Sequence, residues 1–342
     1  MSDEQRLLPT RALDAYLGNL ARVGRTEGTI RKYEQALRQF VTWLGVRPLE
    51  HLIEADLDDY FDFWERDFRR RVARAPEPAT RKHHFSILHS FFSYLDRKNL
   101  LVDKEGKTVR NPIVGLDAPK RVSKPIDWLS DSEDRALLAY QGSPVEMILV
   151  WLLRYTGLRV DEARWVLISD LDLTPGRESL RVRVSKTTAG RRTVPLLPEL
   201  LLPIEQWLTH QRQRGLAGPH HPLLATRNGT PMQPQYIWRV IKRAAFNAGV
   251  RRRPCTCGAT TRGFHQSGCP RSASGEHLSD VEPHGLRRTF GSAARNRGVQ
   301  IDAVSKLLGH SSTVVTEKHY AELLDDTVRT SLLHAYGYQT SA

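Results

Sequence analysis

Residues 155–163 read YTGLRVDEA, and this stretch organises the second half of the chain. It follows residues 143–153, SPVEMILVWLL, which combine a capping box, a proline at the first helical position and a long apolar run. A helix that is apolar on every side is expected at the centre of a domain. Gly157 can end that helix, so Arg159 is expected to begin a new one that carries Glu162.

Arg159 and Glu162 are three residues apart, and two interpretations of the pair stay open. Arg159 could be an ordinary arginine whose ion-pair partner is Glu162. Alternatively, the carboxylate could orient the guanidinium and leave its outer edge for a phosphate, which arginine can bind through two parallel hydrogen bonds.

Two alternating segments follow, SLRVRVSK at 179–186 and RRTVPLL at 191–197, and they flank the sequence TTAG. Alternation of apolar and polar residues on both sides of a short turn predicts a β-hairpin. Lys186 is then on the hairpin turn, where a flexible amine can swing toward a ligand. By itself, a lysine at such a position would more often be a solvated turn residue.

Two histidines follow in the last quarter of the chain. The segment PHGLRRTF is expected to be helical, with His284 and Arg287 one turn apart on the same face. A lone histidine is commonly a core residue, but this spacing favours a joint phosphate site. In the segment LLGH, Gly309 is expected to end a helix and leave His310 exposed. His310 could also serve only to terminate that helix, because a cationic histidine suits a helix C-terminus.

A tyrosine, Tyr320, follows in the sequence TEKHY. It could be a core aromatic, and the adjacent His319 is a competing nucleophile in principle. With the basic residues above, however, the inventory contains guanidiniums, an amine, imidazoles and a phenol, which can bind a phosphate, move protons and attack phosphorus. No carboxylate pair suited to a two-metal nuclease stands among them. The pattern therefore indicates phosphoryl transfer through a covalent tyrosine ester, with no metal and no cofactor.

The strings TGLRVDEA, HGLRRTF and LLGH, with a tyrosine ten residues beyond that GH, resemble the tyrosine recombinase (phage integrase) family, which includes the Xer recombinases. A lone HxxR or TGxR would be weak, whereas all the elements in this order make a strong signal. The resemblance extends from about residue 10 to residue 338. It implies a mainly α fold with a small antiparallel β-sheet, in which a SAM-like helical core-binding domain precedes an α+β catalytic domain.

The resemblance implies six catalytic residues: Arg159, Lys186, His284, Arg287, His310 and Tyr320. Tyr320 would attack the scissile phosphate and form a 3′-phosphotyrosyl link with release of a 5′-hydroxyl. The two arginines and His310 would neutralise the phosphate, His284 would accept the phenol proton and Lys186 would protonate the leaving oxygen. Because a second 5′-hydroxyl can reverse the step, strands would exchange without ATP or a metal.

On this resemblance the chain is expected to be a site-specific recombinase or integrase that binds double-stranded DNA and forms a tetramer on paired sites, alone or with a partner recombinase. A type IB topoisomerase, which relaxes supercoils as a monomer, uses nearly the same residues and is the first alternative. A DNA-binding protein without catalytic activity is the second, but retention of all six residues counts against it.

The composition agrees with a nucleic-acid enzyme. The chain has 342 residues and a formal net charge of +13, which suggests two domains and a polyanionic partner, nucleic acid before an anionic membrane. The longest apolar run, MILVWLL, is too short to span a bilayer, and the N-terminus lacks the pattern of a secretory signal. Three cysteines cannot pair evenly, which fits a reducing compartment, so a cytoplasmic protein is expected.

The first third is expected to be a bundle of at least four helices. Apolar residues at helical spacing begin near Leu13, after Thr29, near Leu57 and after Thr80. Basic residues on the polar faces could contact DNA or could simply be solvated: Arg22, Arg25, Arg31, Lys32, Arg81, Lys82 and His84.

The expected division is a core-binding domain at 8–117, a linker rich in lysine and proline at 118–127, and a catalytic domain at 128–338. The catalytic domain departs from the family in an insertion at about 251–282, which holds all three cysteines. Four residues there could complete a tetrahedral zinc site, although zinc is not the favoured interpretation: Cys255, Cys257, His265 and Cys269. A last helix at about 325–335 could dock on a neighbouring subunit or pack on its own domain.

Overall fold

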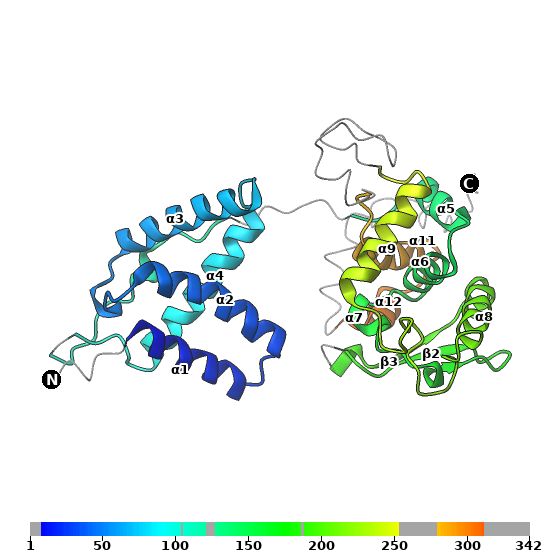
Figure 1. Ribbon diagram of the computed structural model, residues 1–342, viewed down its shortest axis with the longest axis horizontal. Helices are drawn as coiled ribbons and strands as arrows, with labels where there is room; N and C mark the ends of the chain where they lie inside the picture. Colours follow the sequence, from blue (N-terminus) through cyan, green and yellow to red (C-terminus); the bar gives the residue numbers. More distant parts are fainter. Residues whose placement is uncertain (1–7, 104, 121–126, 186–187, 253–278, 311–342) are drawn as a thin grey trace, which may run out of the picture. The chain divides into compact units, whose positions relative to one another are not determined.

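The computed structural model describes residues 8–103, 105–120, 127–185, 188–252 and 279–310. The chain divides into two compact units, residues 1–124 and 125–342. The expected fold class, mainly α with a small antiparallel β-sheet, is confirmed (Figure 1). Within the described ranges, no helix is both long enough and apolar enough to cross a membrane.

The first unit is a helical bundle. Its described elements are α1 (Pro9–Arg22), α2 (Glu27–Leu44), η2 (Leu49–His51), α3 (Glu54–Val72), α4 (Pro78–Arg97) and η3 (Pro112–Gly115). Helix α1 packs along α2, α4 contacts both of them, and η3 contacts α3 and α4. Large side chains fill the interior, among them the fully buried Phe40, Tyr60 and Phe91.

Two of these helices begin earlier than the sequence pattern predicts. Helix α2 begins at Glu27 because its N-cap is Thr26, whose hydroxyl oxygen accepts a hydrogen bond from the N–H of Thr29 (3.4 Å). Helix α4 has Pro78 in its first turn, ahead of Thr80. Proline suits that position because the N–H it lacks would have no partner within the helix.

His84 was expected on the polar face of its helix, and that prediction is wrong. Its side chain is buried, its Nε2 lies 3.0 Å from the Tyr60 hydroxyl oxygen, and its ring stacks on Trp64 with centroids 4.2 Å apart. The reason is helical spacing, because His84 lies one turn before the buried Leu88 and shares its face. Burial lowers the pKa of His84 to about 3, so the ring is neutral.

The other basic residues of this unit fall into two groups. Four are exposed, although Arg31 also donates to Glu27 on its own helix (Nη2–Oε2 3.1 Å): Arg22, Arg25, Arg31 and Lys32. Arg81 and Lys82 are half-buried, and Arg81 donates a hydrogen bond to the Glu65 carboxylate (Nη2–Oε2 2.9 Å). The exposed group on α1, α2 and the turn between them is therefore the more available to an external anion.

The second unit combines helices with one small sheet. Its described elements are α5 (Asp131–Ala139), α6 (Pro144–Thr156), α7 (Val160–Ala163), η4 (Ile168–Asp170), β1 (Leu171–Asp172), β2 (Ser179–Val182), η5 (Thr188–Gly190), β3 (Arg192–Pro195), α8 (Pro198–Arg212), α9 (Pro234–Asn247), α11 (Pro283–Asn296) and α12 (Ile301–Leu308). The strands form an antiparallel sheet in the order β1-β2-β3. The predicted hairpin is confirmed, but its strands are shorter than the alternating segments. Val182 opposite Arg192 is the pair nearest the turn.

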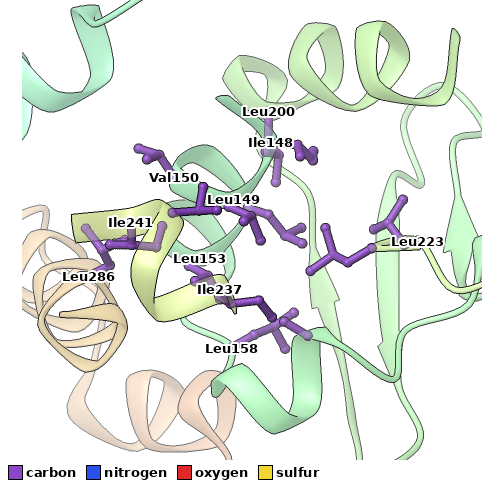
Figure 2. Packing of buried hydrophobic residues seen from close by; sticks show 14 of the residues in the cluster. Ile148, Leu149, Val150, Leu153, Leu158, Leu200, Leu223, Ile237, Ile241 and Leu286 are labelled. Carbon is purple, nitrogen blue, oxygen red and sulfur yellow. The ribbon is translucent and has the colours of Figure 1, made fainter. Parts of the chain in front are cut away.

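Helix α6 is the central helix of this unit, as its apolar sequence predicts. It contacts α5, α8, α9 and α11, and its Ile148, Leu149 and Leu153 are fully buried. Figure 2 shows these side chains in one cluster with Ile237 of α9 and Leu286 of α11. The core thereby fixes the C-terminal end of α6, which is where the candidate site begins.

Some predicted features lie outside the described residues. They are Lys186, Tyr320, the four zinc candidates of the insertion and the last helix at about 325–335. Near the two ends of the insertion, Arg252 and Ser279 pair in an antiparallel bridge, so these ends lie together.

Candidate active site

The site begins at the turn that ends α6. Gly157 has a φ of +61°, in the left-handed region, and a Cβ added to it would lie 2.5 Å from Phe290 Cδ1. Glycine is therefore required both for the backbone conformation and for the close approach of α11. The turn places Arg159 at the N-cap of α7, with Glu162 in the first turn of that helix.

Glu162 is the centre of the site. Arg159 donates to it through its backbone N–H (N–Oε2 3.0 Å) and its guanidinium (Nη1–Oε1 2.6 Å). The Ser185 hydroxyl donates to Oε1 (2.8 Å) and Arg192 Nη2 donates to Oε2 (3.2 Å). Nη1 of Arg287 lies 3.9 Å from Oε2. One buried carboxylate thus contacts groups from α7, the hairpin and α11.

Arg287 lies where the C-terminal ends of two helices meet. Its Nη1 donates to the carbonyl of Gly157 (2.6 Å) and its Nη2 donates to the carbonyl of Leu308. The last carbonyls of a helix have no partner within it and carry its negative end. A buried guanidinium is well suited to this position, because it satisfies both helix ends and cross-links α6 to α12.

Arg192 is a further member of the site that the sequence did not single out. It donates through Nε to Leu307 O (2.5 Å), through Nη1 to Gly190 O (2.8 Å) and through Nη2 to Glu162. The signal was present in the alternation RRTVPLL, because Arg192 has the same parity as the buried Val194 and so points inward.

Helix α12 ends beside this arginine. Gly309 has a φ of +64°, and a Cβ on it would lie 2.8 Å from Arg192 Nη1 and 2.9 Å from Gly190 Cα. Its carbonyl is 3.4 Å from Nη2 of Arg159. The next residue, His310, was expected to be exposed but is half-buried, since the helix end that carries it packs against the hairpin.

The cluster carries an excess of positive charge. Burial alone would raise the pKa of Glu162, but Arg192 and the hydrogen bonds from Arg159 hold it below its usual value. Glu162 is therefore a carboxylate at neutral pH, surrounded by three guanidiniums. The side chain of Arg159 is 33% exposed, against 7% for Arg192 and 3% for Arg287. Arg159 is thus the guanidinium most open to an anion from solvent.

The structure brings Arg159 and Arg287 together and places the helix end that carries His310 against Arg159. His284 lies on α11, one turn before Arg287, but it is exposed where Arg287 is buried. Lys186 is outside the described residues, although the hydroxyl of the preceding Ser185 binds Glu162. Across the described part of the chain, no cluster of three or more histidine, cysteine, aspartate or glutamate residues could hold a metal ion.

Comparison with known proteins gives a consistent result. The Phage integrase family model matches residues 140–326. A tyrosine recombinase of Thermosipho africanus is 23% identical over 313 residues, which is 90% of this chain and 93% of that protein. Tyrosine recombinase XerD of Yersinia pestis is 27% identical over 296 residues, 85% of each chain.

Solved structures share the fold at lower identity. XerH site-specific recombinase bound to palindromic difH in a post-cleavage complex superposes with a TM-score of 0.64 at 16% identity, covering 94% of this chain and 85% of that one. The Tn1549 transposon integrase bound to a circular intermediate DNA gives a TM-score of 0.64 at 18% identity, covering 94% of this chain and 99% of that one. A lambda integrase tetramer bound to a Holliday junction gives a TM-score of 0.62 at 18% identity, covering 90% of this chain and 76% of that one.

Proposed function

The chain belongs to the phage integrase family, and from this premise we propose that it is a site-specific recombinase that cleaves and rejoins DNA through a 3′-phosphotyrosyl intermediate. Its partners are double-stranded DNA and further copies of itself, in a tetramer on paired sites, with or without a partner recombinase. It acts in the cytoplasm and needs no metal and no cofactor.

The observation that carries this proposal is the convergence of Arg159 and Arg287 on Glu162. Two guanidiniums fixed by a buried carboxylate can compensate the charge that develops on a phosphate in the transition state. Because their positions are set by hydrogen bonds to Glu162 and to helix-end carbonyls, little reorganisation is needed when DNA binds.

In the proposed chemical step, these two arginines act together with the residues that the family resemblance assigns. The Tyr320 oxygen attacks phosphorus, the bond from phosphorus to the 5′-oxygen breaks, and a tyrosyl phosphodiester replaces the DNA phosphodiester. His284 accepts the phenol proton, because a free tyrosine has a pKa of about 10 and must be activated. Lys186 supplies a proton to the leaving 5′-oxygen, while Arg159, Arg287 and His310 hold the phosphate. Attack by another 5′-hydroxyl reverses every bond change, so strands rejoin without ATP.

The domain roles follow the same proposal. Residues 8–117 form a core-binding domain, 118–127 a linker and 128–338 the catalytic domain. The exposed basic residues of α1 and α2 contact the phosphate backbone, since lysine and arginine there are free of the core.

The test is capture of the covalent intermediate. Covalent complexes isolated from genomic DNA give the junction, and an oligonucleotide nicked beside that junction becomes a suicide substrate. Denaturing electrophoresis with EDTA present should show a protein–DNA adduct for the wild type and for the matched control Tyr338→Phe, and none for Tyr320→Phe. An adduct that persists in Tyr320→Phe or that requires magnesium contradicts the proposal. Relaxation of supercoils by a monomer would indicate the topoisomerase alternative.

A further inference from the structure

We propose that Arg192 is a positioning residue of this active site. It holds Glu162 and the C-terminal end of α12 at fixed positions relative to the hairpin. The inference rests on the proposed recombinase function. Arg192 does not need to touch DNA for this role, because its side chain is only 7% exposed.

The three donors of Arg192 reach three different segments. Nη2 donates to Glu162, which orients Arg159, and Nη1 donates to the carbonyl of Gly190 in η5, within the connection between β2 and β3. Nε donates to the carbonyl of Leu307 in the last turn of α12. Arg159 caps the helix that holds Glu162, Lys186 comes shortly before η5 in the sequence, and His310 follows α12. One planar guanidinium therefore fixes the mutual distances of the three segments.

These segments are also in direct contact. A Cβ on Gly309 would lie 2.9 Å from Gly190 Cα and 2.8 Å from Arg192 Nη1, so no space separates the end of α12 from the hairpin. A shift of any one segment is transmitted to the others, because a close-packed interior does not deform freely. Loss of the arginine would release the contact that keeps the residue before His310 beside Arg159.

Arg192 also decides which arginines Glu162 binds. Its Nη2 donates to Oε2 at 3.2 Å, and Nη1 of Arg287 lies 3.9 Å from the same oxygen. Without Arg192, the carboxylate would draw Arg287 toward itself and away from the Gly157 carbonyl. The site would keep all its catalytic residues, but Arg287 would be misplaced relative to the phosphate.

This role requires the shape of arginine and not only its charge. The three N–H donors of lysine sit on one nitrogen, which cannot reach the acceptors that arginine meets through three separate nitrogens, Nε, Nη1 and Nη2. If Arg192 only neutralised Glu162, Arg192→Lys would restore function. If it sets geometry, Arg192→Lys should remain defective.

The experiment uses the full-length protein and its own suicide substrate. The cleavage rate at saturating protein, the Kd for a single site and the melting temperature are measured for Arg192→Ala, Arg192→Lys and the control Arg181→Ala, an exposed arginine of β2. We expect both Arg192 variants to cleave about 10- to 100-fold more slowly, as misplacement of a catalytic group by about 1 Å would cause, with an unchanged Kd. Arg181→Ala should cleave at the wild-type rate.

A double-mutant cycle supplies the readout that a purely structural role would not change. If Arg192 acts through Arg159 and Arg287, its removal should slow cleavage less in an Arg159→Ala background than in the wild type. The inference would be overturned if the fold-losses in cleavage rate of the two single variants simply multiply in the double variant. A wild-type cleavage rate for Arg192→Lys would also overturn it. If Arg192→Ala does not fold, Arg192→Lys carries the test, because it keeps a cation beside Glu162. Failure of the wild type to form the tyrosyl adduct would instead refute the proposed function.

Discussion

The guanidinium of Arg287 donates a hydrogen bond to the carbonyl oxygen of Gly157, 130 residues earlier in the chain. Gly157 is the left-handed residue that ends α6, so the backbone turn leading to Arg159 and the anchor of Arg287 are one structural feature. The positions of Arg159 and Arg287 therefore depend on a single glycine.

Substitution of that glycine should destabilise the second unit. Gly157→Ala would strain a φ of +61° and place a methyl group 2.5 Å from Phe290 Cδ1. We expect a loss of about 2–5 kcal/mol in the free energy of unfolding, combining left-handed strain with overpacking. Gly176→Ala is the matched control, because Gly176 has a φ of +81° with open space around it, and it should lose only about 1–2 kcal/mol. Urea denaturation of both variants measures the difference, and equal losses would contradict this account.

Removal of Arg159 and removal of Arg287 should both slow cleavage, but only removal of Arg287 should also lower the free energy of unfolding strongly. Arg159→Ala and Arg287→Ala should each slow cleavage by about 10²- to 10³-fold, because the transition state loses charge compensation. Arg287 is buried and satisfies two helix-end carbonyls, so its loss should also lower the free energy of unfolding by about 2–4 kcal/mol. Single-turnover cleavage and urea denaturation check both effects. A similar loss of stability in Arg159→Ala, or wild-type cleavage by either variant, would refute the distinction.

The buried His84 should make the protein less stable in mild acid. In the unfolded chain its pKa is near 6.5, whereas burial lowers the folded value to about 3. Between these values the unfolded state binds a proton that the folded state does not. Stability is therefore full above pH 6.5 and falls as the pH drops toward 3, by at most about 1.4 kcal/mol per pH unit.

His84→Gln should flatten that dependence, because glutamine can still bond the Tyr60 hydroxyl and does not titrate. The control His89→Gln, an exposed histidine of the same helix, should keep the wild-type slope. Urea denaturation at pH 5 and pH 7 gives the comparison. An unchanged slope in His84→Gln would show that the buried imidazole is not its source.

Local rules predicted much of the fold, since the signals lie within a few residues of each other. The capping box of Ser143 and Glu146, the central helix behind it and the pairing of Arg159 with Glu162 were all readable in this way. His84 was misplaced because a polar residue type was given more weight than its spacing from Leu88. The sequence could predict the helix, but not the hydrogen bond of the imidazole to Tyr60 or its stacking on Trp64.

The site was less predictable because its contacts are long-range. Arg287 could be proposed as a phosphate ligand, but its anchors at Gly157 and Leu308 depend on how α6, α11 and α12 pack. The parity of Arg192 with the buried Val194 marked it as inward-facing. Its role was still missed, because its acceptors Glu162 and Leu307 lie on segments that only the tertiary packing brings to the hairpin.

Lys186 should be distinguishable from the arginines by the atom on which it acts. If its amine protonates the leaving 5′-oxygen, Lys186→Ala should be severely slowed on a normal phosphodiester and largely rescued when that bridging oxygen is sulfur, since a thiolate leaves without a proton. Arg159→Ala, which loses charge compensation at the non-bridging oxygens, should show much weaker rescue on the same substrate. The measurement is the ratio of cleavage rates on the two substrates for each variant. Equal ratios for Lys186→Ala and Arg159→Ala would assign the proton to another group.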